Sequence, residues 1–265
     1  GTPFSVSAAI GFVALFGIAA MDGIVVISAF NAAIAAGVER MMSIGTGDGP
    51  PDIEVAIRVA DRFDCVYATA GVHPHDADKA DAGTYKHIAE LLKHPKVLAL
   101  GEIGLDYFYE HSPREVQKAV FIEQMRVAAD ARMPIVIHTR DAWEDTFALL
   151  EQHWRPTGLP GIMHCFSGGP VEAQRSLDLG FYVSFAGIVT FPKSLEMQAA
   201  AKIVPSERLL VETDAPFLAP APHRGKRNEP AFVVNSAAKV AELRGVEIQE
   251  IERLTTANFR ALTGI

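Results

Sequence analysis

The strongest constraint on the fold is a unit that recurs along the sequence, in which a short apolar run is followed by a turn and a longer helical stretch. The apolar runs are Leu-rich or β-branched and are bounded by Gly, Pro or polar residues, which is typical of buried parallel strands. They are Met41–Gly45, Val66–Gly71, Val97–Leu100, Pro134–Ile137, Gly161–Met163, Phe181–Phe185 and Leu209–Val211. The predicted helices are Ile53–Phe63, Tyr85–His94, Glu115–Ala131, Trp143–His153, Glu172–Leu179, Leu195–Val204, Phe232–Arg244 and Glu247–Leu262. With one more strand near the N-terminus, eight strands alternate with helices, which predicts an α/β fold of the (β/α)8 or TIM-barrel type.

We expect one domain over residues 1–265, because no linker-like change in composition divides the chain. An open doubly wound sheet is the alternative, but no GxGxxG motif follows the first strand. Residues 1–36 are interpreted as a divergent apolar strand and helix. They lack the basic residues of a signal peptide, and Asp22 lies near the middle of the apolar stretch, which disfavours a membrane span.

The charge balance and the cysteines restrict the partners and the compartment. The formal net charge of −8 disfavours a broad nucleic-acid-coating surface, although it allows a local basic patch. Two cysteines, Cys65 and Cys165, cannot form a disulfide framework and suit a reducing compartment. We therefore expect a cytoplasmic protein without a membrane partner, and a monomer.

Ionisable side chains stand at or just beyond the ends of five apolar runs. They are Glu102, His138, His164 and Asp214, with His73 and His75 after a fifth run. The carboxyl ends of barrel strands meet at one face, so these side chains meet in space. Each would lose about 1–3 kcal/mol if buried without a partner, and a divalent cation supplies one. Nitrogen and oxygen ligands suit Zn²⁺ or Mn²⁺, which predicts a metal site. The alternative is a hydrogen-bonded network of carboxylates and imidazoles without a metal.

The same residues belong to motifs that resemble the TatD family of metal-dependent deoxyribonucleases. The motifs are GVHPH (71–75), GEIGLDY (101–107), IHTR (137–140), HCFSG (164–168), ETDAPFLAP (212–220) and RGKRNEP (224–230). They stand in the family's order, and the resemblance covers residues 37–265. It implies an amidohydrolase-like TIM barrel that uses metal-activated water, and a deoxyribonuclease that cleaves phosphodiester bonds at DNA ends or in single strands.

The resemblance also implies a role for each matching residue. Glu102 and Asp214 would be the catalytic pair, with Glu102 shared by or adjacent to two metals and Asp214 orienting the attacking water. His138 and His164 would be further metal ligands, and His73 would lie on the substrate side. The family's first strand usually ends in an H-x-H pair, but here that region reads AAIGFVALF. The sequence therefore leaves open whether one or two ions bind, with Zn, Mg and Mn as the candidate metals.

Basic residues near the predicted mouth suggest a phosphate-binding role. Arg224, Lys226 and Arg227 follow the eighth strand in a Gly- and Pro-rich loop, and Arg140 follows His138. A solvated loop, and pairing of Arg140 with Asp141 or Glu144, are the alternatives. The small number of cations predicts contact with few phosphates, as at a DNA end or a flexible single strand.

Five aromatic residues fall near the predicted mouth, where they either stack on bases or belong to the core and a lid. They are Tyr107, Phe108, Tyr109, Phe166 and Phe217. Cys165 neighbours His164, and strand alternation predicts that its thiol packs away from the site.

Two other functions fit the sequence. The same metal site could hydrolyse a carboxyl ester or amide, for example an aminoacyl ester or a lactone. The chain could also be a binding protein that lost catalysis with the H-x-H pair. The basic loop favours the phosphodiester.

Overall fold

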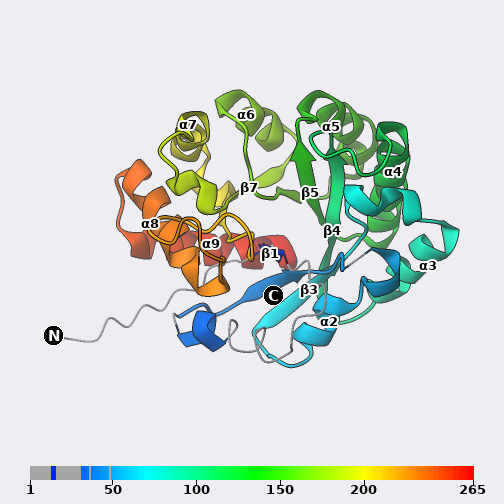
Figure 1. Cartoon of the computed structure of the whole chain (residues 1–265), viewed down its shortest axis with the longest axis horizontal. Helices are drawn as coiled ribbons and strands as arrows, with labels where there is room; N and C mark the ends of the chain where they lie inside the picture. The colour runs from blue at the N-terminus through cyan, green and yellow to red at the C-terminus, as the bar shows by residue number, and fades with distance from the viewer. Residues whose placement is uncertain (1–12, 16–30, 36, 48) are drawn as a thin grey trace.

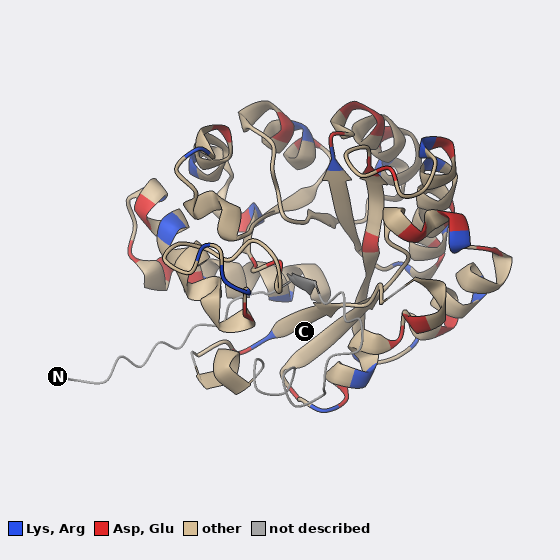
Figure 2. Ribbon diagram, in the orientation of Figure 1, with Lys and Arg blue, Asp and Glu red and all other residues tan. Residues whose placement is uncertain are grey.

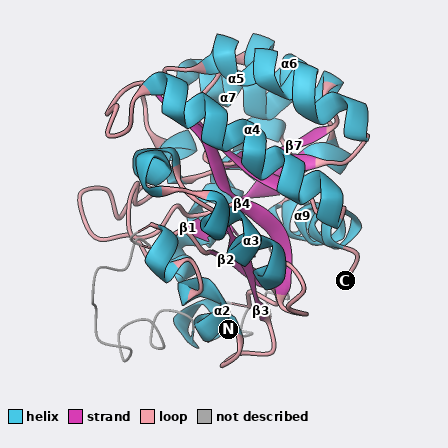
Figure 3. Ribbon diagram, turned by 90° about the vertical axis from the view of Figure 1, so that its right-hand side faces the viewer, coloured by secondary structure: helices cyan, strands magenta, loops and turns pink. Residues whose placement is uncertain are grey.

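The computed structural model describes residues 13–15, 31–35, 37–47 and 49–265. Eight parallel strands form one sheet in which neighbours along the chain pair in order, and helices surround the strands (Figures 1 and 3). The strands are β1 (Val13–Leu15), β2 (Met41–Ile44), β3 (Val66–Ala70), β4 (Val97–Asp106), β5 (Ile135–Arg140), β6 (Gly161–Met163), β7 (Phe181–Phe185) and β8 (Leu209–Val211). The predicted (β/α)8 class is confirmed.

The helices lie outside the strands, each within a few residues of its predicted range. They are α2 (Val55–Ala60), α3 (Ala82–Leu91), α4 (Arg114–Ala131), α5 (Trp143–Leu149), α6 (Pro170–Asp178), α7 (Leu195–Ile203), α8 (Val233–Arg244) and α9 (Ile248–Thr263). Charged residues concentrate on these outer helices and on the loops, with few on the strands (Figure 2). No helix in the described part of the chain is long and apolar enough to cross a membrane.

The N-terminal prediction can be compared with the structure only in part. β1 pairs in parallel with β2, as expected for the additional strand predicted near the N-terminus, and residues 31–35 are helical. The remainder of the 1–36 segment, Asp22 included, lies outside the described residues.

Two strands extend further than predicted, and the extension matters for the site. β4 was expected to stop at Leu100 and β5 at Ile137, but both continue, paired with each other as far as Asp106 and Arg140. Within the extension, Gly104 has a φ of 142° and approaches the β5 backbone closely, which a residue with a side chain could not do. Glu102 and His138 therefore lie within strands, which hold them more firmly than a loop would.

The apolar core has two parts, on the two faces of the strands. The larger part lies between the strands and the helices, with Phe121, Phe147 and Trp154 among its fully buried side chains. The second part unites residues from the other strand face with Phe259 and Leu262 of α9.

Helix α9 lies at the amino end of the strands. Its Asn258 Nδ2 donates to the carbonyl of Ser206 at 2.7 Å and to that of Leu209, where β8 begins, at 2.8 Å. With Phe259 and Leu262 buried against the inner strand residues, α9 closes this end of the barrel. The opposite end, where the strands finish, is left for the site.

Candidate metal centre

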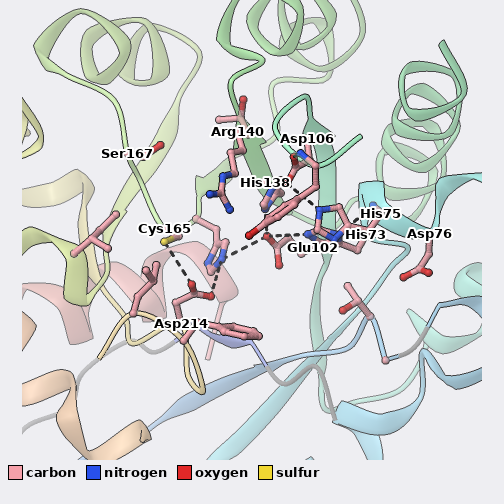
Figure 4. A pocket seen from close by; sticks show the side chains of 18 residues that line it. His73, His75, Asp76, Glu102, Asp106, His138, Arg140, Cys165, Ser167 and Asp214 are labelled. Carbon is pink, nitrogen blue, oxygen red and sulfur yellow. Dashed lines mark hydrogen bonds and ion pairs between the residues drawn. The ribbon is translucent and has the colours of Figure 1, made fainter. Parts of the chain in front are cut away.

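A cavity of about 620 Å³ lies at the carboxyl ends of the strands, and most of the predicted site residues line it (Figure 4). The predicted residues found there are Glu102, His138, His164, Asp214, His73, His75 and Arg140. They come from segments following or ending β3, β4, β5, β6 and β8, so residues far apart in the sequence meet as predicted. Arg224, Lys226 and Arg227 are exposed on their loop and are not among the lining residues.

The Glu102 carboxylate is fully buried at the centre of this group. Its Oε1 lies 2.7 Å from His138 Nδ1, 3.5 Å from His164 Nε2 and 3.8 Å from His73 Nε2. His164 Nε2 is also 3.6 Å from Asp214 Oδ1. One nitrogen of each of three imidazoles therefore points toward the same carboxylate.

The second nitrogen of two of these imidazoles meets a second carboxylate. His138 Nε2 lies 3.1 Å from Asp106 Oδ2, and His164 Nδ1 lies 2.7 Å from Glu212 Oε2. Both carboxylates are buried, and Glu212 also accepts a hydrogen bond from the Cys165 amide. A carboxylate on the outer nitrogen is the usual support of a metal-binding histidine, because it fixes ring orientation and raises ligand basicity.

The charges in the cluster are strongly coupled. Burial alone would raise the pKa of Glu102, but His164 and His138 lower it to about 2. Burial would lower the pKa of His138, but hydrogen bonds with Asp106 and Glu102 raise it to about 9. The pKa of His164 is likewise raised against burial, by the charges of Glu212 and Glu102. Protons on these imidazoles supply the positive charge that the buried carboxylates need when no cation is bound.

An unpartnered atom tests whether a cation fits here. Glu102 Oε2 is buried and has no hydrogen-bond partner in the described structure. An orphaned carboxylate oxygen is costly unless something else satisfies it. With Glu102, His138, His164 and Asp214 converging, the donors suit a divalent cation that prefers nitrogen and oxygen. These four residues would hold it.

His73 has a different role from the other two imidazoles, although it lies among the potential ligands. Its Nδ1 accepts a hydrogen bond from the His75 amide at 3.2 Å, so the ring proton belongs on Nε2. Burial, and then the nearby His138, lower the pKa of His73, which keeps the ring neutral. We interpret His73 as a hydrogen-bond donor facing the cavity.

The backbone around the cavity is unusually strained. Six described residues other than glycine have a positive φ, and five of them lie in segments that follow strands. Those five are Glu110, Asp141, Cys165, Asp214 and Leu218, with φ between 43° and 59°. Such conformations are costly for residues with a side chain and tend to gather at functional sites.

Cys165 corrects one prediction. Strand alternation would turn its thiol away from the site, but β6 ends at Met163 and Cys165 lies in the following turn. Its side chain lines the cavity, with Sγ 3.7 Å from Asp214 Oδ2. Burial raises the pKa of this thiol well above its ordinary value, so it is not a ready thiolate ligand.

The five aromatic residues separate into two kinds. Phe166 is fully buried in the core, and Tyr107 is half-buried with its hydroxyl donating to Asp145 at 2.6 Å. Neither is a free stacking surface. Phe108, Tyr109 and Phe217 are exposed.

Arg140 is held by aromatic rings rather than by an acidic residue. Its guanidinium carbon lies 4.0 Å from the centre of the Phe108 ring and 4.7 Å from that of Tyr109. Glu144, one of the two alternative partners, pairs with Arg175 instead. Arg140 has no carboxylate partner within the described residues, which leaves its charge available to a ligand.

Replacing Glu212 tests the support of His164. We expect Glu212→Gln to weaken binding of a divalent metal about 10- to 100-fold, because the amide cannot carry the charge that stabilises the imidazole. Isothermal titration of the metal-stripped protein with Zn²⁺ or Mn²⁺ measures this. The matched control is Glu252→Gln on α9, another buried carboxylate (3% exposed) but at the closed end. Equal affinities in the two variants would contradict the assignment.

Comparisons with known proteins agree with this geometry. Residues 26–264 match the family model described as TatD related DNase. A Bacillus subtilis (strain 168) protein, named as the uncharacterized metal-dependent hydrolase YabD, is 41% identical over 225 residues, covering 85% of this chain and 87% of the relative. The 3'-5' ssDNA/RNA exonuclease TatD of Klebsiella pneumoniae (strain 342) is 40% identical over 237 residues, covering 87% and 89%. The structure of YJJV, a TatD homologue from Escherichia coli K12, superposes with a TM-score of 0.89 at 25% identity, covering 98% and 99%.

Proposed function

The chain belongs to the TatD-related DNase family of metal-dependent hydrolases, and from that premise we propose that it cleaves phosphodiester bonds at the ends of single-stranded DNA. The observation that carries the proposal is the buried Glu102 carboxylate, whose Oε2 has no hydrogen-bond partner in the described structure and whose Oε1 is approached by two carboxylate-supported imidazoles, those of His138 and His164. Arg140 at the cavity wall favours a phosphate substrate. The relative named as a single-strand exonuclease supports the same substrate class.

A divalent cation at this site supplies a more acidic water molecule and polarises a phosphoryl oxygen. We propose that one ion, which Glu102, His138, His164 and Asp214 would hold, is enough.

The side chains around that site accept the proton of the water, bind the phosphates and orient the imidazoles. Asp214 accepts the proton of the attacking water through Oδ2, whose hydrogen-bond partner among the described residues is the weak donor Cys165. The water oxygen bonds to phosphorus as the bond to the leaving sugar oxygen breaks, and that oxygen takes up a proton from solvent. His73 donates a hydrogen bond from Nε2 to a phosphoryl oxygen, where negative charge grows in the transition state. Arg140 binds a neighbouring phosphate, and Asp106 and Glu212 keep the two imidazoles oriented.

Cleavage of labelled oligonucleotides tests the proposal. The metal-loaded protein is given a single strand labelled at its 5′ or 3′ end, a blunt duplex of the same sequence, and p-nitrophenyl acetate. We expect the single strand to be shortened and the ester to turn over far more slowly. Faster turnover of the ester would indicate a carboxyl ester hydrolase. If the protein takes up no metal and cleaves none of the substrates, the binding-protein alternative is supported.

The salt dependence of binding measures how many phosphates the protein contacts. Two or three neutralised phosphates on a single strand predict a slope of log K against log salt of about −1.4 to −2. Fluorescence anisotropy between 50 and 200 mM salt gives this slope. A slope steeper than about −5 would mean an extended basic surface and would contradict the proposal.

We also propose a cytoplasmic location and a monomeric state. Cys65 and Cys165 are unpaired, which supports the proposed cytoplasmic location. The predicted monomer can be checked by analytical ultracentrifugation.

A further inference from the structure

The exposed aromatic residues of the described structure gather at one place. Phe108 is 55% exposed, Tyr109 51% and Phe217 58%, and every other Phe, Tyr or Trp in the described part of the chain is buried or half-buried. All three follow strand ends at the mouth of the cavity. Large exposed aromatic side chains contribute little to folding, so their concentration at one rim indicates a binding surface.

These rings stand on opposite walls of the cavity. Phe108 and Tyr109 follow β4, and Phe217 follows β8, four strands away in an eight-stranded sheet. Tyr109 and Phe217 both line the cavity. Between the two walls lie Glu102 and Asp214, which both contact His164 Nε2. A group bound at the centre would therefore have an aromatic surface on each side.

The backbone holds both walls in fixed relation to the proposed ligands. Asp106 Oδ1 accepts hydrogen bonds from the amides of Phe108 at 3.0 Å and Tyr109 at 2.8 Å, while its Oδ2 contacts His138. On the other wall the Phe217 amide donates to the carbonyl of Asp214 at 2.8 Å. Each ring is thus tied through one residue to the centre, and little ordering is needed on binding.

The surroundings of the rings match a nucleotide rather than an apolar partner. Phe108 and Tyr109 meet edge to face at 4.8 Å, the Arg140 guanidinium packs against both, and His111 stacks on Tyr109 at 5.5 Å. Phe217 is 58% exposed and has no ring or cation neighbour among the described residues. Aromatic rings stack on every nucleobase, and a guanidinium beside them suits the attached phosphate.

We propose that the two nucleobases flanking the scissile phosphate stack on opposite walls, one on Phe217 and the other on the Phe108–Tyr109 pair. The inference rests on the proposed nuclease function and deepens it. Bases in a duplex have their faces covered by their neighbours, so both nucleotides must be unpaired to reach the rings. The stacking would then be the reason for a preference for single strands.

Abasic substrates test each wall separately. Three single strands of equal length are compared: one intact, and one each with a tetrahydrofuran residue at the nucleotide on either side of the scissile bond. We expect Phe217→Ala and Tyr109→Ala each to lower kcat/KM for the intact strand by between about fivefold and about a hundredfold. On the abasic strand that lacks the base proposed to stack on the substituted ring, each variant should have the same kcat/KM as the wild type. The strand for which this holds should differ between the two variants. Phe217→Trp should retain activity, and Leu195→Ala, an exposed apolar residue on α7 (66% exposed), is the control.

A binding measurement separates failure of this inference from failure of the nuclease proposal. 2-Aminopurine replaces either flanking base in a phosphorothioate-linked strand, and its fluorescence is measured with wild type and with both alanine variants. Quenching that each variant loses at one position supports the stacking, whether or not the strand is cut. Equal quenching in wild type and variants overturns it, as does an equal loss of rate on all three strands. No cleavage of any oligonucleotide by the wild type overturns the nuclease proposal alone.

Discussion

The Glu102→Gln variant should lose both its divalent metal and its catalytic activity. The amide is almost isosteric with the carboxylate, but it removes the negative charge toward which His138, His164 and His73 all point. A cation at such a site contributes several kcal/mol to transition-state stabilisation. We therefore expect kcat/KM for a single strand to fall on the order of a thousandfold or more. Metal content after dialysis and single-turnover cleavage measure the two losses independently.

Thermal unfolding gives a third readout that does not depend on activity. Metal binding to the native state stabilises it by about 2.7 kcal/mol when the free ion is at 100 times Kd. The wild type and the Glu252→Gln control should therefore melt at a higher temperature when metal is added, and Glu102→Gln should not. A Glu102→Gln protein that still takes up stoichiometric metal and cleaves at the wild-type rate would place the centre elsewhere.

The Asp214→Asn variant should bind metal more weakly but lose catalysis to a greater extent. An amide oxygen can still face the ion, but it cannot accept the proton of the attacking water. General base catalysis is typically worth 10²–10⁴-fold, so we expect kcat to fall by about that factor even when metal is saturating. Titrating the metal during the assay separates the loss of affinity from the loss of rate.

A matched control for this variant is Asp178→Asn on α6, an exposed carboxylate whose partner is the side chain of Gln174. It should leave kcat unchanged. If saturating metal restored the rate of Asp214→Asn to that of the wild type, Asp214 would be a ligand only, and another group would have to take the proton.

Much of the fold and the centre of the site follow from sequence because they depend on repetition and on strand ends. The alternation of apolar runs with helices predicts a barrel, and the polar residues that finish the runs predict which side chains meet. Glu102, His138, His164 and Asp214 do meet, although nothing local in the chain relates β4 to β8. Their convergence follows from the rule that parallel strands end at a common face.

The supporting carboxylates were missed for a physical reason. Asp106 and Glu212 lie in the same motifs as the predicted ligands, but their roles depend on which imidazole nitrogen they reach, and sequence carries no such orientation. A usable signal was present, since each stands two to four residues from a predicted carboxylate in a buried segment. The prediction for Cys165 was wrong because strand alternation was applied beyond Met163, where β6 ends as predicted, and Cys165 lies in the turn that follows.

The closure of the amino end by α9 has a consequence for biosynthesis. Phe259 and Leu262 complete the inner cluster, and both emerge from the ribosome after β8 and the whole of the preceding sheet. A nascent chain that already contains the strands therefore still exposes inner residues such as Ile162 and Leu210 to water. Exposed apolar surface of this kind is what chaperones bind and what drives aggregation of partly made proteins. For this chain the exposure of the inner apolar residues ends only when α9 has been synthesised.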